Sequence, residues 1–330
     1  LHLYQNGKLI NTKTRNLIVE DDVEQTNDEK NYNVTLVEGE NEFVAIAVNS
    51  QNTESMPQSI RVLYTSSSQT LIKPQGIQAH LLIVGIDEYL NPKYNLNYAV
   101  ADASGFQESL QKGLQEITSK THVYFIKDKE AVRETIFKKF QEIAEVANPQ
   151  DIFIFYYAGH GVMSLDEEEE FYIVPTDVTQ LYGDSGGLKQ KGISANELKQ
   201  IAAGIPAQKQ LYILDACQSA GALDAVASRG FAEEKAIAQL ARSTGTHWLT
   251  ASGSKQYATE FDELGHGVFT YALLEALSGK ADSGDNRITV NEIKAYLETR
   301  VPEISEKYKG SPQYPSSFGF GQDFPVSVYK

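Results

Sequence analysis

The sequence predicts an α/β fold in which a mainly parallel sheet lies between layers of helices, preceded by a small antiparallel β-domain. From residue 80 onward, continuous apolar runs alternate with helical patterns, whereas the first 64 residues alternate apolar and polar side chains. Runs that are apolar at every position are typical of strands buried on both faces, and strict alternation is typical of strands with one exposed face. The chain has 330 residues, 41% of them hydrophobic, which is enough for one large and one small core.

The small β-domain is expected over residues 1–64. Its strand signals lie at residues 32–36, 44–48 and 60–64, with a turn signal at 38–41. This is shorter than the roughly 100 residues of an immunoglobulin-type sandwich, so we expect an abridged, sandwich-like unit used for recognition or docking. A polar stretch and then Pro74 and Gly76 predict a linker over residues 65–78. Because strand-like sequence begins directly at Leu1, we expect this chain to be an excerpt of a longer precursor.

The large domain is expected over residues 79–330. Its apolar runs, read as parallel strands, are residues 81–84, 123–126, 152–157, 211–214 and 247–250. Helical faces between them are indicated by apolar side chains at helical spacing: Phe106, Leu110 and Leu114; Val132, Ile136, Phe140 and Ile143; Phe269, Leu273 and Leu277. In open parallel sheets, reacting groups collect at the carboxyl ends of the strands, so those ends are where chemistry is expected.

Two of these strand ends carry residues suited to nucleophilic catalysis. Residues 158–161 read Ala-Gly-His-Gly, and residues 215–219 read Asp-Ala-Cys-Gln-Ser. A thiol at Cys217 and an imidazole at His160 would supply a nucleophile and its general base, and the amides of Gly161 and Cys217 would donate to an oxyanion. Glycines beside His160 would let the backbone approach a substrate closely. No third triad residue is evident, and a lone cysteine at a strand end is also a common small core residue.

Segments 155–161 (Phe-Tyr-Tyr-Ala-Gly-His-Gly) and 214–219 (Leu-Asp-Ala-Cys-Gln-Ser) resemble the two catalytic motifs of the caspase, metacaspase and bacterial caspase-like peptidases. Cys217 follows His160 by 57 residues (217 minus 160), close to the roughly 50 of the caspase order. Further segments that resemble bacterial members are residues 82–86, 98–103, 173–177 and 265–271. The resemblance spans about residues 80–300. It implies a caspase-like three-layer sandwich and a cysteine endopeptidase with Cys217 as nucleophile and His160 as base.

The resemblance also implies the specificity. Caspases that cut after aspartate use arginine in the first substrate (S1) pocket, whereas metacaspase-like members use acidic residues and cut after arginine or lysine. It maps Asp102 and Asp215 onto that pocket, and it places residues 252–256 at the pocket's border. A carboxylate pair matches a guanidinium and repels an aspartate, so cleavage after Arg or Lys is expected. The other interpretation of both aspartates is as local caps of a helix start or a loop.

Calcium is a possible cofactor, since several metacaspases require it. The acidic run 166–170 offers Asp166 and Glu167 as candidate ligands, and Asp224 would fit such a site, but a solvated acidic loop is the commoner explanation of such a run. Residues 194–197, where metacaspase-like calcium sites place paired aspartates, form a capping-box pattern instead. Residues 289–292 form a second capping-box pattern, so the faintly EF-hand-like segment 281–286 before them is expected to be structural. His266, which lies between two glycines, is also expected to be structural. Zinc is disfavoured, because the histidines are scattered.

Composition limits the partners. A net charge of −15 repels nucleic acid and anionic membranes, and no apolar run is long enough to span a bilayer. The single cysteine favours a reducing, cytoplasmic location. Bacterial relatives are often effectors in defence, switched on by a sensor or partner protein, and self-cleavage after Arg229, Lys235 or Arg242 is a further hypothesis. Two alternatives remain: a caspase scaffold that binds or signals with little turnover, and a cysteine hydrolase acting on a non-peptide acyl bond.

Overall fold

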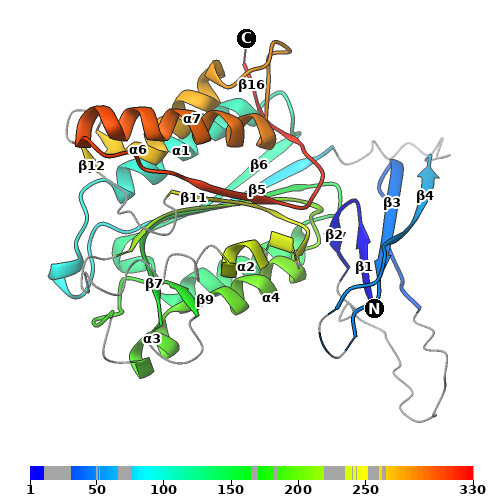
Figure 1. Cartoon of the computed structure of the whole chain (residues 1–330), viewed down its shortest axis with the longest axis horizontal. Coiled ribbons are helices and arrows are strands. Elements are labelled where there is room, and N and C mark those ends of the chain that lie inside the picture. Colours follow the sequence, from blue (N-terminus) through cyan, green and yellow to red (C-terminus); the bar gives the residue numbers. More distant parts are fainter. Residues whose placement is uncertain are drawn as a thin grey trace.

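The computed structural model describes residues 1–10, 31–49, 51, 53–65, 76–164, 170–181, 185–218, 235–239, 241–242, 244–251, 260–261 and 265–329. At residues 185–186, 217–218, 260–261 and 309 it describes the backbone alone. Within these residues, a large three-layer α/β domain stands beside a small antiparallel sheet (Figure 1). The predicted fold class is confirmed.

An eight-stranded sheet forms the middle layer of the large domain. Its main path runs in the order β15 (Ser316–Gly319), β11 (His247–Thr250), β10 (Lys209–Gln218), β7 (Ile152–Met163), β5 (Gln78–Gly85) and β6 (Lys120–Lys127). All neighbours on this path are parallel except β15, which pairs antiparallel with β11. The end of β7 also pairs with β8 (Phe171–Ile173), which pairs with β9 (Ile193–Ser194). Every expected parallel strand is present, and β7 and β10 continue beyond their apolar runs into the two motifs.

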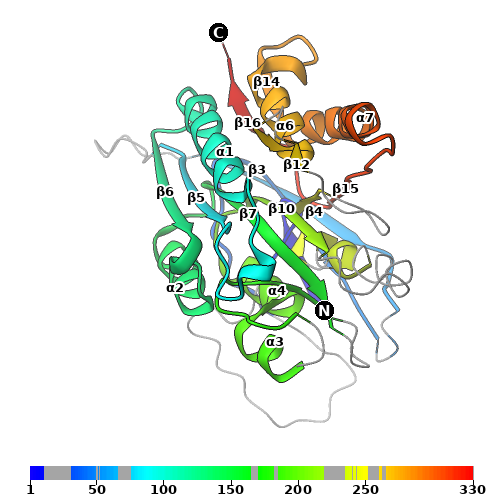
Figure 2. The same ribbon diagram turned by 90° about the vertical axis from the view of Figure 1, so that its left-hand side faces the viewer.

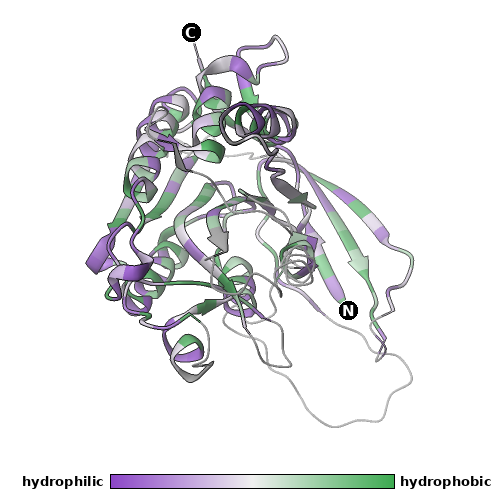
Figure 3. Ribbon diagram, turned by 60° about the vertical axis from the view of Figure 1, so that its left-hand side comes forward, coloured by the Kyte–Doolittle hydropathy of each residue, from purple (hydrophilic) through white to green (hydrophobic). Residues whose placement is uncertain are grey.

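Helices cover both faces of this sheet. One face carries α1 (Ala99–Leu114), α6 (Val268–Glu275) and α7 (Val290–Lys309), and the other carries α2 (Arg133–Val146) and α4 (Ala195–Gly204), with α3 (Ser185–Lys191) nearby. Figure 2 shows β6, β5, β7 and β10 side by side between α1 and α2. Figure 3 shows the apolar residues gathered along the strands and the polar ones on the outer faces of the helices. The described helices include none long and apolar enough to cross a membrane.

The two cores follow from the alternation of side chains along each buried strand. On one face Ile83, Ile154 and Ile213 pack against Phe106 of α1 and Phe269 of α6. On the other face the layer is aromatic, and the rings of Tyr212 and Trp248 stack 4.2 Å apart.

Both predicted capping boxes are present: Ser194 with Glu197 begins α4, and Thr289 with Glu292 begins α7. Short elements complete the domain: η1 (Pro92–Tyr94), η2 (Asp128–Glu130), η3 (a π-helix, Ala276–Lys280), β12 (Glu260–Phe261), β13 (His266–Gly267), β14 (Arg287–Thr289) and β16 (Pro325–Val328).

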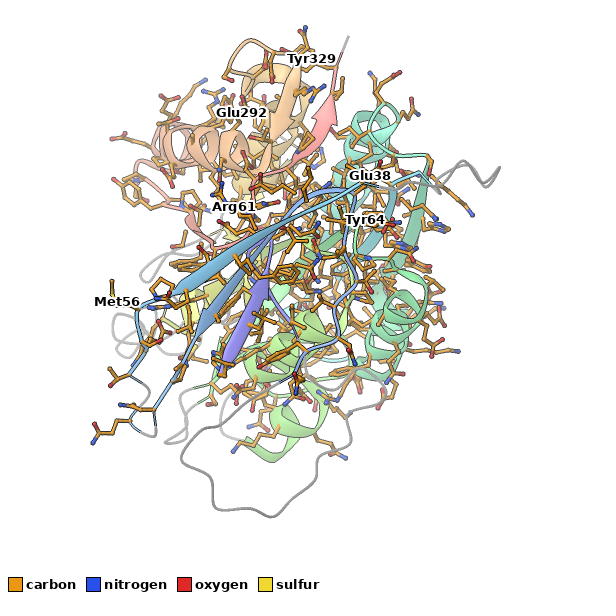
Figure 4. The ribbon with its side chains drawn as sticks, turned by 90° about the vertical axis from the view of Figure 1, so that its right-hand side faces the viewer. Glu38, Met56, Arg61, Tyr64, Glu292 and Tyr329 are labelled. Atoms are coloured by element: carbon orange, nitrogen blue, oxygen red, sulfur yellow. The ribbon has the colours of Figure 1, made fainter. Side chains whose placement is uncertain are left out.

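The small sheet has the order β2 (Lys8–Leu9), β1 (His2–Gln5), β3 (Gly39–Ile46) and β4 (Gln58–Tyr64), and it is a single layer rather than a pair of facing sheets in the described residues. The strand expected at residues 32–36 is wrong. Side chains hold that segment instead: the Gln5 amide donates to the Thr35 carbonyl, and Asn41 exchanges hydrogen bonds with the backbone of Val37. Met56, Arg61 and Tyr64 lie exposed along the outer strand side of this sheet (Figure 4).

The turn between β1 and β2 inserts into the large domain. Asn6 and Gly7 both have positive φ, as a tight hairpin requires, and Gly7 touches the backbones of Gly245 and Gly321 so closely that no side chain would fit. Lys8 is buried, and its ammonium group donates to the carbonyls of Ile205 and Ala207 just before β10. Burial lowers the pKa of Lys8 to about 7. The small sheet therefore contacts the segment just before β10, the strand that carries Cys217.

Candidate active site

The two motif strands are neighbours. β7 and β10 run parallel in a continuous register from Lys209 opposite Ile152 to Gln218 opposite Gly161, and this register sets Cys217 directly opposite His160. Adjacent strands lie about 4.8 Å apart, so the backbones of these residues are as close as two sheet positions can be. The position of the Cys217 thiol lies outside the described side chains.

The His160 imidazole is held from the loop that precedes α1. Its Nε2 lies 2.7 Å from the backbone carbonyl oxygen of Tyr94 at the end of η1. A carbonyl only accepts, so Nε2 carries a proton, and in the neutral ring the lone pair is on Nδ1. The Tyr89 hydroxyl accepts a hydrogen bond from the His160 amide at 2.9 Å, and the two rings lie 4.9 Å apart. The Tyr94 backbone carbonyl thus orients the His160 imidazole, a role for which the sequence showed no third side chain.

The glycines beside His160 have packing reasons of their own. A Cβ at Gly159 would lie 2.6 Å from the Tyr157 hydroxyl and 2.8 Å from the Tyr89 hydroxyl. The Tyr157 hydroxyl in turn lies 2.8 Å from the His160 carbonyl. A Cβ at Gly161 would press on the Phe171 ring at 2.8 Å, and Gly161 lies between Ile173 of β8 and Gln218 of β10. These glycines therefore let hydroxyls and an aromatic ring pack around the histidine backbone.

Asp102 and Asp215, here called the acidic pair, both face the start of α6. Asp102 lies in the first turns of α1 and is 4% exposed, and Asp215 lies on β10 two residues before Cys217 and is 7% exposed. The Gly267 amide donates to both oxygens of Asp102 at 3.2 Å, and His266 Nδ1 lies 2.8 Å from Asp102 Oδ1. The Thr270 hydroxyl donates to Asp215 Oδ2 at 2.6 Å. Both carboxylates therefore accept hydrogen bonds from the N-terminal end of α6, which attracts negative charge.

The same geometry brings the acidic pair together. A Cβ added to Gly267 would lie 3.0 Å from Asp102 Oδ2 and 3.7 Å from Asp215 Oδ2, so the two carboxylates flank one point. Behind them, the Tyr156 hydroxyl lies 2.6 Å from Thr270 Oγ1. The single Thr270 proton goes to Asp215, so Tyr156 is the donor of that second bond. A chain of hydrogen bonds thus orients Asp215 from inside the core.

Sequence reasoning missed several of these residues. Tyr94 acts through its backbone, so its side-chain identity carries no signal. Tyr89, Thr270 and His266 are separated from the motifs by tens of residues, and only the fold brings them close. Segment 265–271 resembles bacterial caspase-like members, and this resemblance is the one signal in the sequence that points to His266.

The described residues do not fit a calcium site where metacaspase-like sites would place one. The Glu197 carboxylate binds the Arg133 guanidinium and closes the capping box of α4. Burial raises the pKa of Glu197, but hydrogen bonds from Arg133 and from Ser194 outweigh it and bring that pKa below its usual value. An arginine held this way excludes a cation. Asp166, Glu167 and Asp224 lie outside the described residues, as do Arg229 and residues 252–256.

A second group of carboxylates lies in the α7 layer. Ligand oxygens of Asp282, Asp285 and Glu292 are within 4.8 Å of one another. Each accepts hydrogen bonds from the local backbone, and Asp282 also accepts from the Tyr329 hydroxyl at 2.5 Å (Glu292 and Tyr329 are labelled in Figure 4).

Comparison with known proteins is decisive for the family. The family model described as the caspase domain matches residues 78–319. The chain belongs to the caspase-domain family. Caspase-domain proteins are in general cysteine peptidases. No curated protein matches the chain in sequence. Among solved structures, the crystal structure of protein GSU0716 from Geobacter sulfurreducens is similar, with a TM-score of 0.52 at 16% identity, covering 77% of this chain and all of that one. At this identity the likeness shows the fold alone.

Proposed function

We propose that this caspase-domain chain is a cysteine endopeptidase that cuts proteins after arginine or lysine, with Cys217 and His160 as its catalytic residues. The observation that carries the proposal is the acidic pair: two buried carboxylates flank one point, and one of them is two residues before Cys217 on the same strand. Two neighbouring carboxylates suit a cationic side chain, because they accept charge-assisted hydrogen bonds from it.

In the proposed reaction, the Cys217 thiolate attacks the scissile carbonyl carbon. His160 takes the thiol proton at Nδ1 and later gives it to the departing amine, while the Tyr94 carbonyl keeps the other ring nitrogen protonated. The amides of Gly161 and Cys217 are the proposed donors to the oxyanion. Water then releases the acyl group from Cys217 and restores the thiol.

The acidic pair also accounts for selectivity. A guanidinium or ammonium group gains charge-assisted hydrogen bonds from carboxylates, whereas an aspartate at the same position would meet two like charges. Asp102 and Asp215 are therefore the proposed S1 residues. The rival view, that they only cap α6, predicts an effect on stability with no effect on the substrate residue that is preferred.

Fluorogenic peptides that differ only in the residue before the scissile bond (Arg, Lys or Asp) test the proposal. We expect Arg and Lys peptides to be cut and the Asp peptide to be left, with no turnover in a Cys217→Ala variant. Asp215→Asn should raise KM for the Arg peptide about 10-fold or more, because a neutral amide loses the charge and keeps the shape. Asp151→Asn, a buried carboxylate at the start of β7, is the matched control and should leave the Arg preference intact.

Preferential cutting after Asp, or turnover that survives in Cys217→Ala, would overturn the proposal. Binding of Arg peptides without any turnover would favour the alternative of a binding protein on a caspase scaffold.

Regulation by a partner protein and self-cleavage remain proposals. Of the candidate self-cleavage residues, Lys235 is exposed, and Arg242 forms an ion pair with Glu54 near the small sheet. Cleavage after Arg242 would therefore cut the chain at a residue that contacts Glu54. Intact mass of the wild type after incubation, against Cys217→Ala, tests it: an uncut wild type that is active on peptides would exclude self-cleavage. A role as a regulated effector in bacterial defence rests on the family resemblance.

A further inference from the structure

The dipeptide His266–Gly267 lies against the acidic pair, between β13 and the start of α6. His266 contacts Asp102 through its ring, and Gly267 contacts Asp102 through its amide. Neither residue belongs to the Cys217 and His160 motifs. The ring of His266 packs against α1, and the missing side chain of Gly267 leaves space beside both carboxylates.

The His266 ring makes two contacts with α1: a hydrogen bond to Asp102 and a packing contact at Gly105. Asp102 Oδ1 can only accept while ionised, so the Nδ1 hydrogen points to the carboxylate at 2.8 Å. The other side of the ring lies over Gly105, one turn further along α1: a Cβ there would be 3.1 Å from the ring Cε1 and 3.6 Å from Nε2. A side chain at residue 105 would therefore press on the His266 ring, and also on Leu274, whose Cδ1 would lie 3.2 Å from the added Cβ.

Gly267 is required by space and not by backbone conformation. Its φ of −62° and ψ of 149° are open to any residue. An added Cβ would be 3.0 Å from Asp102 Oδ2 and 3.7 Å from Asp215 Oδ2, where it would take up the volume beside both carboxylates. A planar cation that binds the two carboxylates together needs that volume.

We propose that His266 and Gly267 form the specificity-determining wall of the S1 pocket, with His266 as the positioning residue for Asp102 and Gly267 as the residue that leaves room for a guanidinium. The inference rests on the proposed function and deepens it. The bond from His266 removes rotational freedom from the Asp102 carboxylate before substrate arrives, which lowers the cost of binding. The missing side chain at Gly267 admits the broad guanidinium of arginine as well as the slimmer ammonium of lysine.

Three variants separate positioning from packing. His266→Ala removes the donor and the ring, whereas His266→Asn places a side-chain amide nitrogen near the position of Nδ1 and restores the donor alone. Gly267→Ala adds one methyl group at a backbone conformation that alanine adopts without strain. Steady-state kinetics on matched Arg and Lys peptides, with thermal unfolding of each variant, give the readouts. Binding of benzamidine to the same variants in a Cys217→Ala background, measured by calorimetry, reports on the pocket without turnover.

We expect His266→Ala to raise KM for the Arg peptide and the benzamidine Kd about 10-fold with kcat changed less than about 3-fold, since a hydrogen bond to a charged group is lost. His266→Asn should recover most of that loss. Gly267→Ala should weaken the Arg peptide more than the Lys peptide, lowering the Arg-to-Lys ratio of kcat/KM about 5-fold or more. Equal losses for Arg and Lys in Gly267→Ala, or no rescue by His266→Asn, would overturn the inference, because packing alone predicts them.

Different results would contradict the proposed function and the assignment of His266 and Gly267 to the S1 pocket. If the wild type cuts after Arg or Lys in a Cys217-dependent way but the His266 and Gly267 variants keep its KM and selectivity, only the wall assignment is wrong. If the wild type shows no such cleavage and its Cys217→Ala form binds no benzamidine, the proposed function is wrong and the wall assignment falls with it.

Discussion

Replacing Thr270 with valine tests the hydrogen-bond chain behind the acidic pair. Thr270 and Tyr156 are both 0% exposed, and the chain runs from the Tyr156 hydroxyl through Thr270 to Asp215 with two contacts of 2.6 Å. Valine keeps the shape and removes the donor. A hydrogen bond to a charged group contributes about 1.5–3 kcal/mol, and Asp215 is too deeply buried for water to replace it freely. We therefore expect Thr270→Val to lower the free energy of unfolding by about 2 kcal/mol.

The assay is equilibrium urea unfolding in the Cys217→Ala background, with peptide kinetics on the active form. Thr244→Val is the matched control: Thr244 is also 0% exposed, but its hydroxyl bonds the neutral Thr246 hydroxyl at 2.6 Å, so a loss of only about 1 kcal/mol is expected. In kinetics, Thr270→Val should raise KM for Arg peptides because Asp215 is no longer oriented, while Thr244→Val should not. Equal destabilisation by the two variants together with unchanged KM would refute the reasoning.

Two further predictions concern the histidine and the small sheet. Tyr89→Phe removes the hydroxyl that accepts from the His160 amide, and we expect kcat to fall about 3- to 10-fold with little change in KM, measured on the Arg peptide. For Lys8, burial lowers the folded-state pKa to about 7 against an ordinary value of 10.5, so between these pH values the unfolded chain binds more protons than the folded one. The stability of the wild type relative to Lys8→Met should therefore rise from pH 7 to pH 10, by at most about 1.4 kcal/mol per pH unit, and should be flat below pH 7. Urea unfolding at several pH values checks this, and parallel profiles for the two proteins would contradict it.

Local patterns predicted much of the large domain because the relevant forces are local or repeat along the chain. Residues 152–157 are apolar at every position since β7 is covered on both faces, and the strand is recognisable without its neighbours. The capping box Ser194–Glu197 likewise depends only on residues one helical turn apart. The strand expected at residues 32–36 failed for the complementary reason. Its apolar alternation suits a strand, but side chains bond the backbone here: the Thr35 carbonyl accepts from Gln5, 30 residues away in sequence, and the adjoining Val37 bonds to Asn41, four residues further on.

For the candidate site, the sequence by itself determined which residues stand at strand ends: His160 and Cys217 follow apolar runs, and parallel strands bring such ends to one edge. Only the tertiary structure decided three other features of the site. These are the register that sets Cys217 opposite His160, the Tyr94 carbonyl that orients the imidazole, and the contact of His266 with Asp102. The physical reason is how far apart along the chain the interacting residues lie. Strand and helix signals repeat every two to four residues, whereas a carboxylate, a backbone carbonyl and a glycine-sized space become neighbours only when elements far apart in the chain pack together.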